Sequence, residues 1–208
     1  MTSRRRPLLA FLGLAPFALA GLSACASPSP NYYRIETVAG GQIRGGPPSV
    51  EVRSISIPGY LDRQGIVKQA NDFKLDIHEN DIWAEPLSDM LEATLVQNLT
   101  SRLPGTMVIG AGGSIGANAN LLVETNVLRF DPDPDGQMVL QVQVGIRDSA
   151  SMRLLGTRSI TKRGPSRQPV VANIVAGMST LWGQASDDIA AFLVQTWRKH
   201  PHAGRQGS

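Results

Sequence analysis

Apolar residues recur along this chain with two different periods, and each period predicts one kind of element. The spacing of four residues from Leu87 through Leu91 and Leu95 to Leu99 places these side chains on one face of a helix. Glu85-Pro86 comes just before this run and Pro104-Gly105 just after it, so both ends of the helix are marked. A second run with helical spacing predicts a long final helix, with apolar positions Ile174, Met178, Leu181, Ala185, Ile189 and Phe192.

Elsewhere the apolar positions alternate, as expected for strands with one buried face. The clearest case is 137–147, where Met138, Leu140, Val142, Val144 and Ile146 alternate with polar residues or glycine. Residues 121–130 are apolar on both faces, which predicts a strand covered on both sides. Further strands are expected over 32–38, from 49, and over 65–68, 73–77, 106–109 and 154–162. Near Arg53-Ser54 the apolar positions change face, as a β-bulge would cause.

These elements predict a single domain over residues 32–197. Its fold class is α/β (α+β), with a largely antiparallel β-sheet packed with two long amphipathic helices. The polar tail, 198–208, is expected to be disordered.

The N-terminal segment has the parts of an export signal. Arg4, Arg5 and Arg6 precede an apolar run from Leu8 to Ala20 that is short for a membrane span. Leu22-Ser23-Ala24-Cys25 follows, and it resembles the lipobox of bacterial lipoproteins, in which the cysteine is lipidated and becomes the first residue of the mature chain. We therefore expect a signal peptide over 1–24 and a lipidated Cys25 with a Ser/Pro-rich tether over 25–31. Both the ordinary secretory route and the twin-arginine route stay open.

Removal of the signal peptide changes the charge of the chain. It takes away three arginines and no acidic residue, so the 20 basic side chains fall to 17, equal to the 17 acidic ones. A nucleic-acid binder needs a basic surface that neutralises phosphates, so we predict no nucleic-acid partner. Cys25 is the only cysteine, which leaves none for a disulfide.

Two motifs resemble a known family. They are Gly59-Tyr60-Leu61-Asp62-Arg63 and Trp83-Ala84-Glu85-Pro86-Leu87, supported by Ile66-Val67-Lys68, Asn98-Leu99 and Arg129-Phe130-Asp131. On these residues the chain is similar to the ABC-type transport auxiliary lipoprotein family over nearly all of residues 31–196.

The resemblance implies a non-catalytic lipoprotein that faces the periplasm from the outer membrane. Ala26, rather than Asp, after the lipidated cysteine also favours the outer membrane. The implied partners are a mammalian-cell-entry (MCE) domain protein and its ABC permease and ATPase, in the transport of lipid or another hydrophobic solute between membranes. Phospholipid and a second copy of the chain are further candidate partners. No cofactor is expected beyond the N-acyl and S-diacylglycerol groups on Cys25.

The candidate partner-binding residues are Tyr60, Leu61, Asp62, Arg63 and Trp83. The Tyr-Leu-Asp-Arg turn either contacts the partner or packs locally beneath its own loop. Trp83, just before a helix, either fills the core or anchors an interface. Trp182 and Trp197 on the last helix are expected to pack in the core and at the helix end.

Three other patterns could carry chemistry. Gly112-Gly113-Ser114-Ile115-Gly116 has the form of a nucleophile elbow, but a strand rather than a helix is expected behind it. Asp131, Asp133 and Asp135 resemble the start of a calcium loop that has Val142 where a bidentate Glu belongs. His78 has no second histidine or cysteine nearby for zinc. We therefore predict no catalytic residue and no metal site. A lipoprotein chaperone or pilot for another outer-membrane complex, and a periplasmic hydrolase, are the alternative functions.

Overall fold

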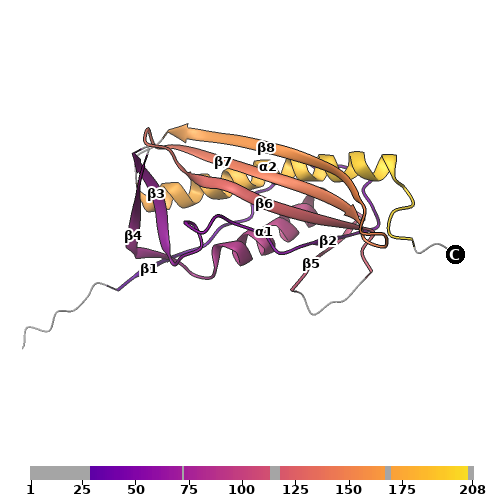
Figure 1. Ribbon diagram of the computed structural model, residues 1–208, viewed down its shortest axis with the longest axis horizontal. Helices are drawn as coiled ribbons and strands as arrows, with labels where there is room; N and C mark the ends of the chain where they lie inside the picture. The colour runs from indigo at the N-terminus through magenta and orange to yellow at the C-terminus, as the bar shows by residue number, and fades with distance from the viewer. Residues whose placement is uncertain (1–28, 72, 113–117, 167–169, 206–208) are drawn as a thin grey trace, which may run out of the picture.

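The long strands of a five-stranded sheet run along the long axis of the molecule (Figure 1). The computed structural model describes residues 29–71, 73–112, 118–166 and 170–205. The order of the strands across the large sheet is β5-β2-β6-β7-β8. Their bounds are β2 Ser49–Val52, β5 Met107–Gly110, β6 Leu121–Pro132, β7 Gln137–Asp148 and β8 Leu154–Ser166. The three long strands β6, β7 and β8, which match the strands predicted over 121–130, 137–147 and 154–162, form an antiparallel meander. β2 runs parallel to both of its neighbours.

Two helices pack together against one face of this sheet: α1, Leu87–Arg102, and α2, Val171–Lys199 (Figure 1). The leucines spaced four apart in α1 are buried, as the sequence pattern predicts. Trp182 on α2 is fully buried, with its ring centroid 6.2 Å from that of Phe130 on β6. Its indole Nε1 donates a hydrogen bond to the carbonyl of Leu91, 3.1 Å away, so one side chain joins both helices and the sheet.

A second, three-stranded sheet stands at the end of the molecule where the described chain begins (Figure 1). It has the order β1-β4-β3, formed by β1 Asn31–Tyr33, β4 Lys74–Trp83 and β3 Gly65–Asn71. β3 and β4, which correspond to the strands predicted over 65–68 and 73–77, form an antiparallel hairpin, and β1 runs parallel to β4. With its two long helices and mainly antiparallel sheets, the structure confirms the α+β prediction, and it adds the division into two sheets.

The first strand is shorter than predicted. It ends at Tyr33, and residues 34–46, which we call the strap, continue across the helices without sheet pairing. Backbone groups of the strap bind α2 and α1 directly: the Glu36 amide donates to Ser179 Oγ, and the Val38 amide donates to Asn98 Oδ1. The chain leaves the sheet because these helix side chains satisfy its backbone groups in place of a neighbouring strand.

The strand predicted from residue 49 and the tail predicted over 198–208 also differ in the structure. β2 ends at Val52, and pairing resumes at an isolated bridge between Ser56 and Asn126, which accounts for the change of apolar face. After α2, residues 200–205 pack against the body where a disordered tail was expected. Ala203 is buried there, and the Gly204 amide donates to Asp148 Oδ1 over 3.0 Å.

Candidate functional site

The Tyr-Leu-Asp-Arg motif forms a tight turn on the face of the large sheet that the helices leave uncovered. The amides of Leu61 and Asp62 both donate to the carbonyl of Pro58, which closes the turn. Tyr60 Oη donates to Asp131 Oδ2 over 2.6 Å, and Arg129 Nε donates to Asp131 Oδ1 over 2.7 Å. The Asp131 side chain is only 5% exposed, so these donors stabilise a carboxylate that has little access to water.

This arrangement fixes the protonation of the tyrosine. Burial, followed by the hydrogen bond to Asp131 and its negative charge, raises the pKa of Tyr60 well above its ordinary value. The phenol therefore keeps its proton, and acts as a donor, to a higher pH than a solvent-exposed tyrosine would. Tyr60 holds the turn on the sheet, a structural role.

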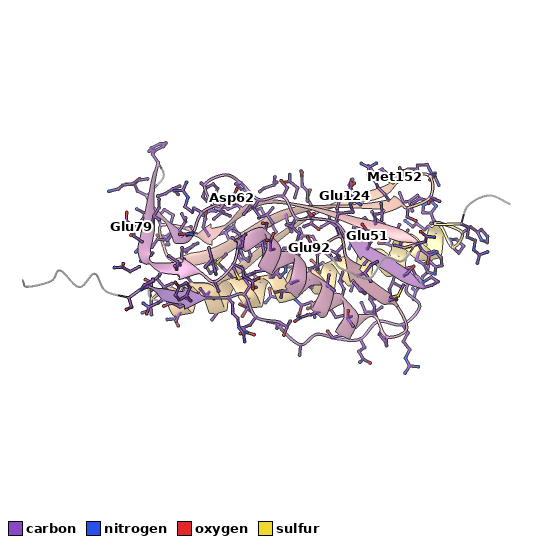
Figure 2. The ribbon with its side chains drawn as sticks, turned by 90° about the horizontal axis from the view of Figure 1, so that it is seen from below. Glu51, Asp62, Glu79, Glu92, Glu124 and Met152 are labelled. Carbon is purple, nitrogen blue, oxygen red and sulfur yellow. The ribbon has the colours of Figure 1, made fainter. Side chains whose placement is uncertain are left out.

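The turn divides the motif into buried and exposed side chains. Leu61 is 3% exposed and lies in the core, whereas Asp62 and Arg63 are exposed to solvent. Figure 2 shows Asp62 on the side of the molecule toward Glu79 and the three-stranded sheet. The predicted partner contact is accessible at Asp62 and Arg63, on a turn held rigid by Tyr60, and not at Leu61.

Trp83 connects this turn to the helices. It ends β4 and is 6% exposed, so the indole fills the core, the first of the two roles considered for it. Pro86 caps the N-terminus of α1, and the buried Leu87 begins the helix. The Trp-Ala-Glu-Pro-Leu motif is thus a strand-to-helix connection.

The two motifs meet in space. The Trp83 amide donates to the carbonyl of Gln64, the residue after the Tyr-Leu-Asp-Arg turn, over 2.8 Å. Trp83 also pairs in register with Tyr33 of β1, and the Ala84 amide donates to the Tyr33 carbonyl. Both motifs therefore belong to one frame that joins the N-terminal strand, the hairpin and α1.

A buried arginine holds the strap, and sequence reasoning missed it. The Arg102 side chain is fully buried, and its Nε donates to Asp187 Oδ1 over 2.6 Å. Its remaining nitrogens donate to the carbonyls of Val38, Asn98 and Gly183 at 3.0 to 3.2 Å. An arginine in the last turn of a helix normally indicates a solvated charge near the negative end of the helix dipole, so no sequence signal pointed to burial.

The Asn98 of the family motif belongs to the same polar cluster. Its Nδ2 donates to Ser186 Oγ over 3.1 Å, while its Oδ1 accepts from the Val38 amide of the strap. Asn98 and Arg102 therefore bind the strap, α1 and α2 together. The contacts of both residues hold these segments of the fold together.

Where the structure describes them, the segments considered for chemistry form ordinary turns. Of the nucleophile-elbow segment, residues 113–117 lie outside the described residues. The Asp133 carboxylate accepts from the amides of Asp135 and Gln137 within its own turn, and Asp131 is held by Tyr60 and Arg129. Among the described residues, no group of three or more His, Cys, Asp or Glu side chains could hold a metal ion.

Two hollows among the described residues are candidate binding sites. An open groove of about 580 Å³ lies on the uncovered sheet face, where Glu124 is paired with Arg147 at 2.8 Å. A cavity of about 300 Å³ between α2 and the ends of β7 and β8 is lined by Met138, Gly177 and Leu181 among others. Its described lining residues include no acidic or histidine side chain. Neither hollow brings a nucleophile together with a hydrogen-bonded base among the described residues.

The helices and the predicted lipidation site bear on how the protein could meet a membrane. None of the described helices is long and apolar enough to cross a bilayer. Cys25, the predicted lipidation site, lies outside the described residues, and Asn31 in β1 follows it by six positions.

Comparisons with known proteins cover most of the chain. Among curated proteins, the Intermembrane transport lipoprotein PqiC of Escherichia coli (strain K12) is 29% identical over 182 residues, covering 85% of this chain and 94% of PqiC. The protein of that name from Shigella flexneri gives the same values. The crystal structure of protein XCC0632 from Xanthomonas campestris has a TM-score of 0.69 at 17% identity, covering 83% of this chain and 99% of that one, and it supports the fold alone.

The family comparison identifies the chain. The family model described as ABC-type transport auxiliary lipoprotein component matches residues 34–190. This range begins in the strap, includes both motifs and the polar cluster around Arg102, and extends into α2. The resemblance expected from the two motifs is thereby confirmed, and the chain belongs to the ABC-type transport auxiliary lipoprotein component family.

Proposed function

We propose that this protein is a non-catalytic periplasmic subunit of an MCE/ABC-type system that moves lipid between membranes, anchored in the outer membrane through Cys25. The family match over residues 34–190 carries the proposal, because it includes the elements that hold both motifs. The two PqiC proteins, whose name includes intermembrane transport, are covered over 94% of their length, which supports a similar role for the whole domain.

The proposed mechanism is structural coupling. A lipid that crosses the aqueous periplasm needs a shielded apolar path, because exposing its chains to water costs about 0.8 kcal/mol per methylene. A protein that holds the end of such a path at the outer membrane assists transport without making or breaking a bond. The rigid frame between β1, the hairpin and α1 suits this role, because it connects the chain after the anchor directly to the folded body.

The proposed docking surface for the MCE protein is the turn that exposes Asp62 and Arg63. Its backbone is fixed by the Pro58 carbonyl and by Tyr60, so little backbone entropy is lost when a partner binds these two side chains. Exposed charges on a rigid turn favour selective recognition of a partner that carries complementary charges.

The anchor is tested by Cys25→Ser in cells. The parent protein should stay in the membrane fraction after a carbonate wash, because several acyl chains give stable anchoring. Cys25→Ser should appear in the soluble periplasmic fraction. Retention of the variant in the washed membranes would contradict lipid anchoring at this residue.

The docking surface is tested by a photo-crosslinking amino acid at position 63 in the lipidated protein. We expect an adduct with an MCE-domain protein. The matched control carries the crosslinker at Met152, which is 53% exposed and lies toward the other end of the molecule (Figure 2). Equal MCE adducts from both positions, or none from position 63, would contradict docking at this turn.

A further inference from the structure

Exposed apolar side chains gather on the three-stranded sheet. Phe73, at the turn between β3 and β4, is fully exposed, and Leu75 and Ile77 in β4 are 39% and 38% exposed. Leu75 and Ile77 alternate in β4 and therefore lie on one side of the strand, and Phe73 precedes them in the adjoining turn. We call these three residues the apolar strip. Single exposed apolar residues are ordinary on a surface, but an alternating series on one hairpin marks a contact surface.

The covalent connection places this strip near the predicted lipid anchor. Asn31 follows Cys25 by six positions, and a chain of that length spans at most about 20 Å. Asn31 is paired with Asp81 of β4, and its Nδ2 donates to Asp81 Oδ1 over 2.9 Å. The base of the hairpin is therefore held close to the membrane that contains the acyl chains.

The length of β4 allows the strip to reach the same membrane. Phe73 precedes Asp81 by eight positions, which corresponds to at most about 26 Å of strand. This reach is similar to the length of the tether, so the hairpin can touch the bilayer while the acyl chains on Cys25 stay in it. The three-stranded sheet also stands at the end of the molecule where the described chain begins (Figure 1).

The charges of the hairpin do not attract it to a lipid headgroup. Residues 65–83 contain two lysines and four acidic side chains, and Lys68 is paired with Asp76 at 3.1 Å. Because the hairpin has no excess of positive charge, apolar burial is the attraction that a bilayer offers. A bilayer fits this requirement, because the anchor keeps it within reach of the strip at all times.

We propose that the apolar strip inserts into the membrane leaflet that holds the acyl chains of Cys25. This second contact orients the domain on the membrane, so that the turn at Asp62 and Arg63 keeps a defined position relative to the bilayer. The inference rests on the proposed lipid anchor, and it adds a bilayer-binding site formed by side chains of the folded domain.

A single fluorescent label tests the contact. Cys25 is the only cysteine in the sequence, and lipidation consumes its thiol, so Phe73→Cys gives one reactive thiol for an environment-sensitive nitrobenzoxadiazole label. The lipidated, labelled protein is reconstituted into vesicles of phosphatidylethanolamine and phosphatidylglycerol, with or without doxyl-labelled phospholipid as quencher. Leu75→Cys is the second test position, and Met152→Cys is the exposed control.

Labels at positions 73 and 75 should lose about half of their emission to doxyl lipid, as expected for side chains at the boundary between headgroups and acyl chains. The label at 152 should be unaffected. Vesicle-bound protein whose labels at 73 and 75 respond like the label at 152 would overturn the inference. So would labels that are shielded from water but not quenched by lipid, because another protein surface would then cover the strip. Failure of the parent protein to float with vesicles would refute the anchor itself, and the inference with it.

Discussion

Replacing Arg102 with Ala should destabilise the domain more than the loss of an ordinary charged residue. The guanidinium is fully buried and donates to Asp187 and to three backbone carbonyls from the strap, α1 and α2. Truncation leaves the Val38 and Gly183 carbonyls without this donor and removes the buried aliphatic stem. The strap then loses one of its attachments to the helices.

The magnitude follows from the exposure of the two partners. Removing one partner of a buried charge pair costs about 3–5 kcal/mol, and hydrogen bonds to charged groups contribute about 1.5–3 kcal/mol each. Asp187 is 47% exposed and can be hydrated once it is unpaired, so we expect the lower part of the range, about 3 kcal/mol. With a urea dependence of about 2 kcal/mol per molar, the unfolding midpoint should fall by about 1.5 M.

Urea unfolding followed by circular dichroism measures this shift. Arg158→Ala is the matched control, because Arg158 lies 4.5 Å from the centre of the Phe192 ring and donates to Gln195 at the exposed surface. This control should lose less than about 1 kcal/mol. Trypsin should also cut the Arg102→Ala variant faster in the strap, at Arg34 or Arg44. A midpoint no lower than that of Arg158→Ala, together with an unchanged cleavage rate, would refute the assigned role of Arg102.

Two further predictions concern the strap and the Tyr60 turn. Gly40→Ala should destabilise the domain by about 1–3 kcal/mol, because the added Cβ would overlap the Arg102 guanidinium. The control Gly41→Ala places its Cβ in open space and should be near neutral. Equal melting temperatures for the two variants would contradict the packing of the strap. Tyr60→Phe should cost about 1–2 kcal/mol, because the buried Asp131 carboxylate loses a donor, and urea unfolding measures this loss. The raised pKa of Tyr60 stabilises the fold fully below pH 10, the ordinary tyrosine value, and this contribution is lost as the pH rises above it. Tyr60→Phe should therefore show a weaker loss of stability above pH 10 than the parent, and equal alkaline sensitivity would argue against a buried phenol donor.

The elements that could be predicted from the sequence are those whose burial follows a regular period. The leucines of α1 and the alternating residues of β7 are buried as expected, because helix and strand geometry alone places them on one face. Trp182 was expected in the core and is fully buried there. The family motifs were equally visible, because they are local strings of residues.

The features that escaped prediction depend on contacts between distant segments. Residues 34–38 of the strap were expected in the first strand, but side chains of α1 and α2 bind their backbone. The burial of Arg102 requires carbonyls from three separate segments to converge, which no local pattern records. Similarly, Leu61 and Trp83 were candidates for partner contact, and only the packing of the turn and of β4 shows that they are buried.

Capture of the native partners tests the proposed function most directly. The tagged, lipidated protein would be crosslinked in cells, purified, and analysed by mass spectrometry for bound proteins and lipids. The account predicts recovery of an MCE-domain protein with its ABC permease and ATPase. Recovery of a secretin or another outer-membrane complex, with no MCE protein, would contradict it and would favour a role as an assembly factor.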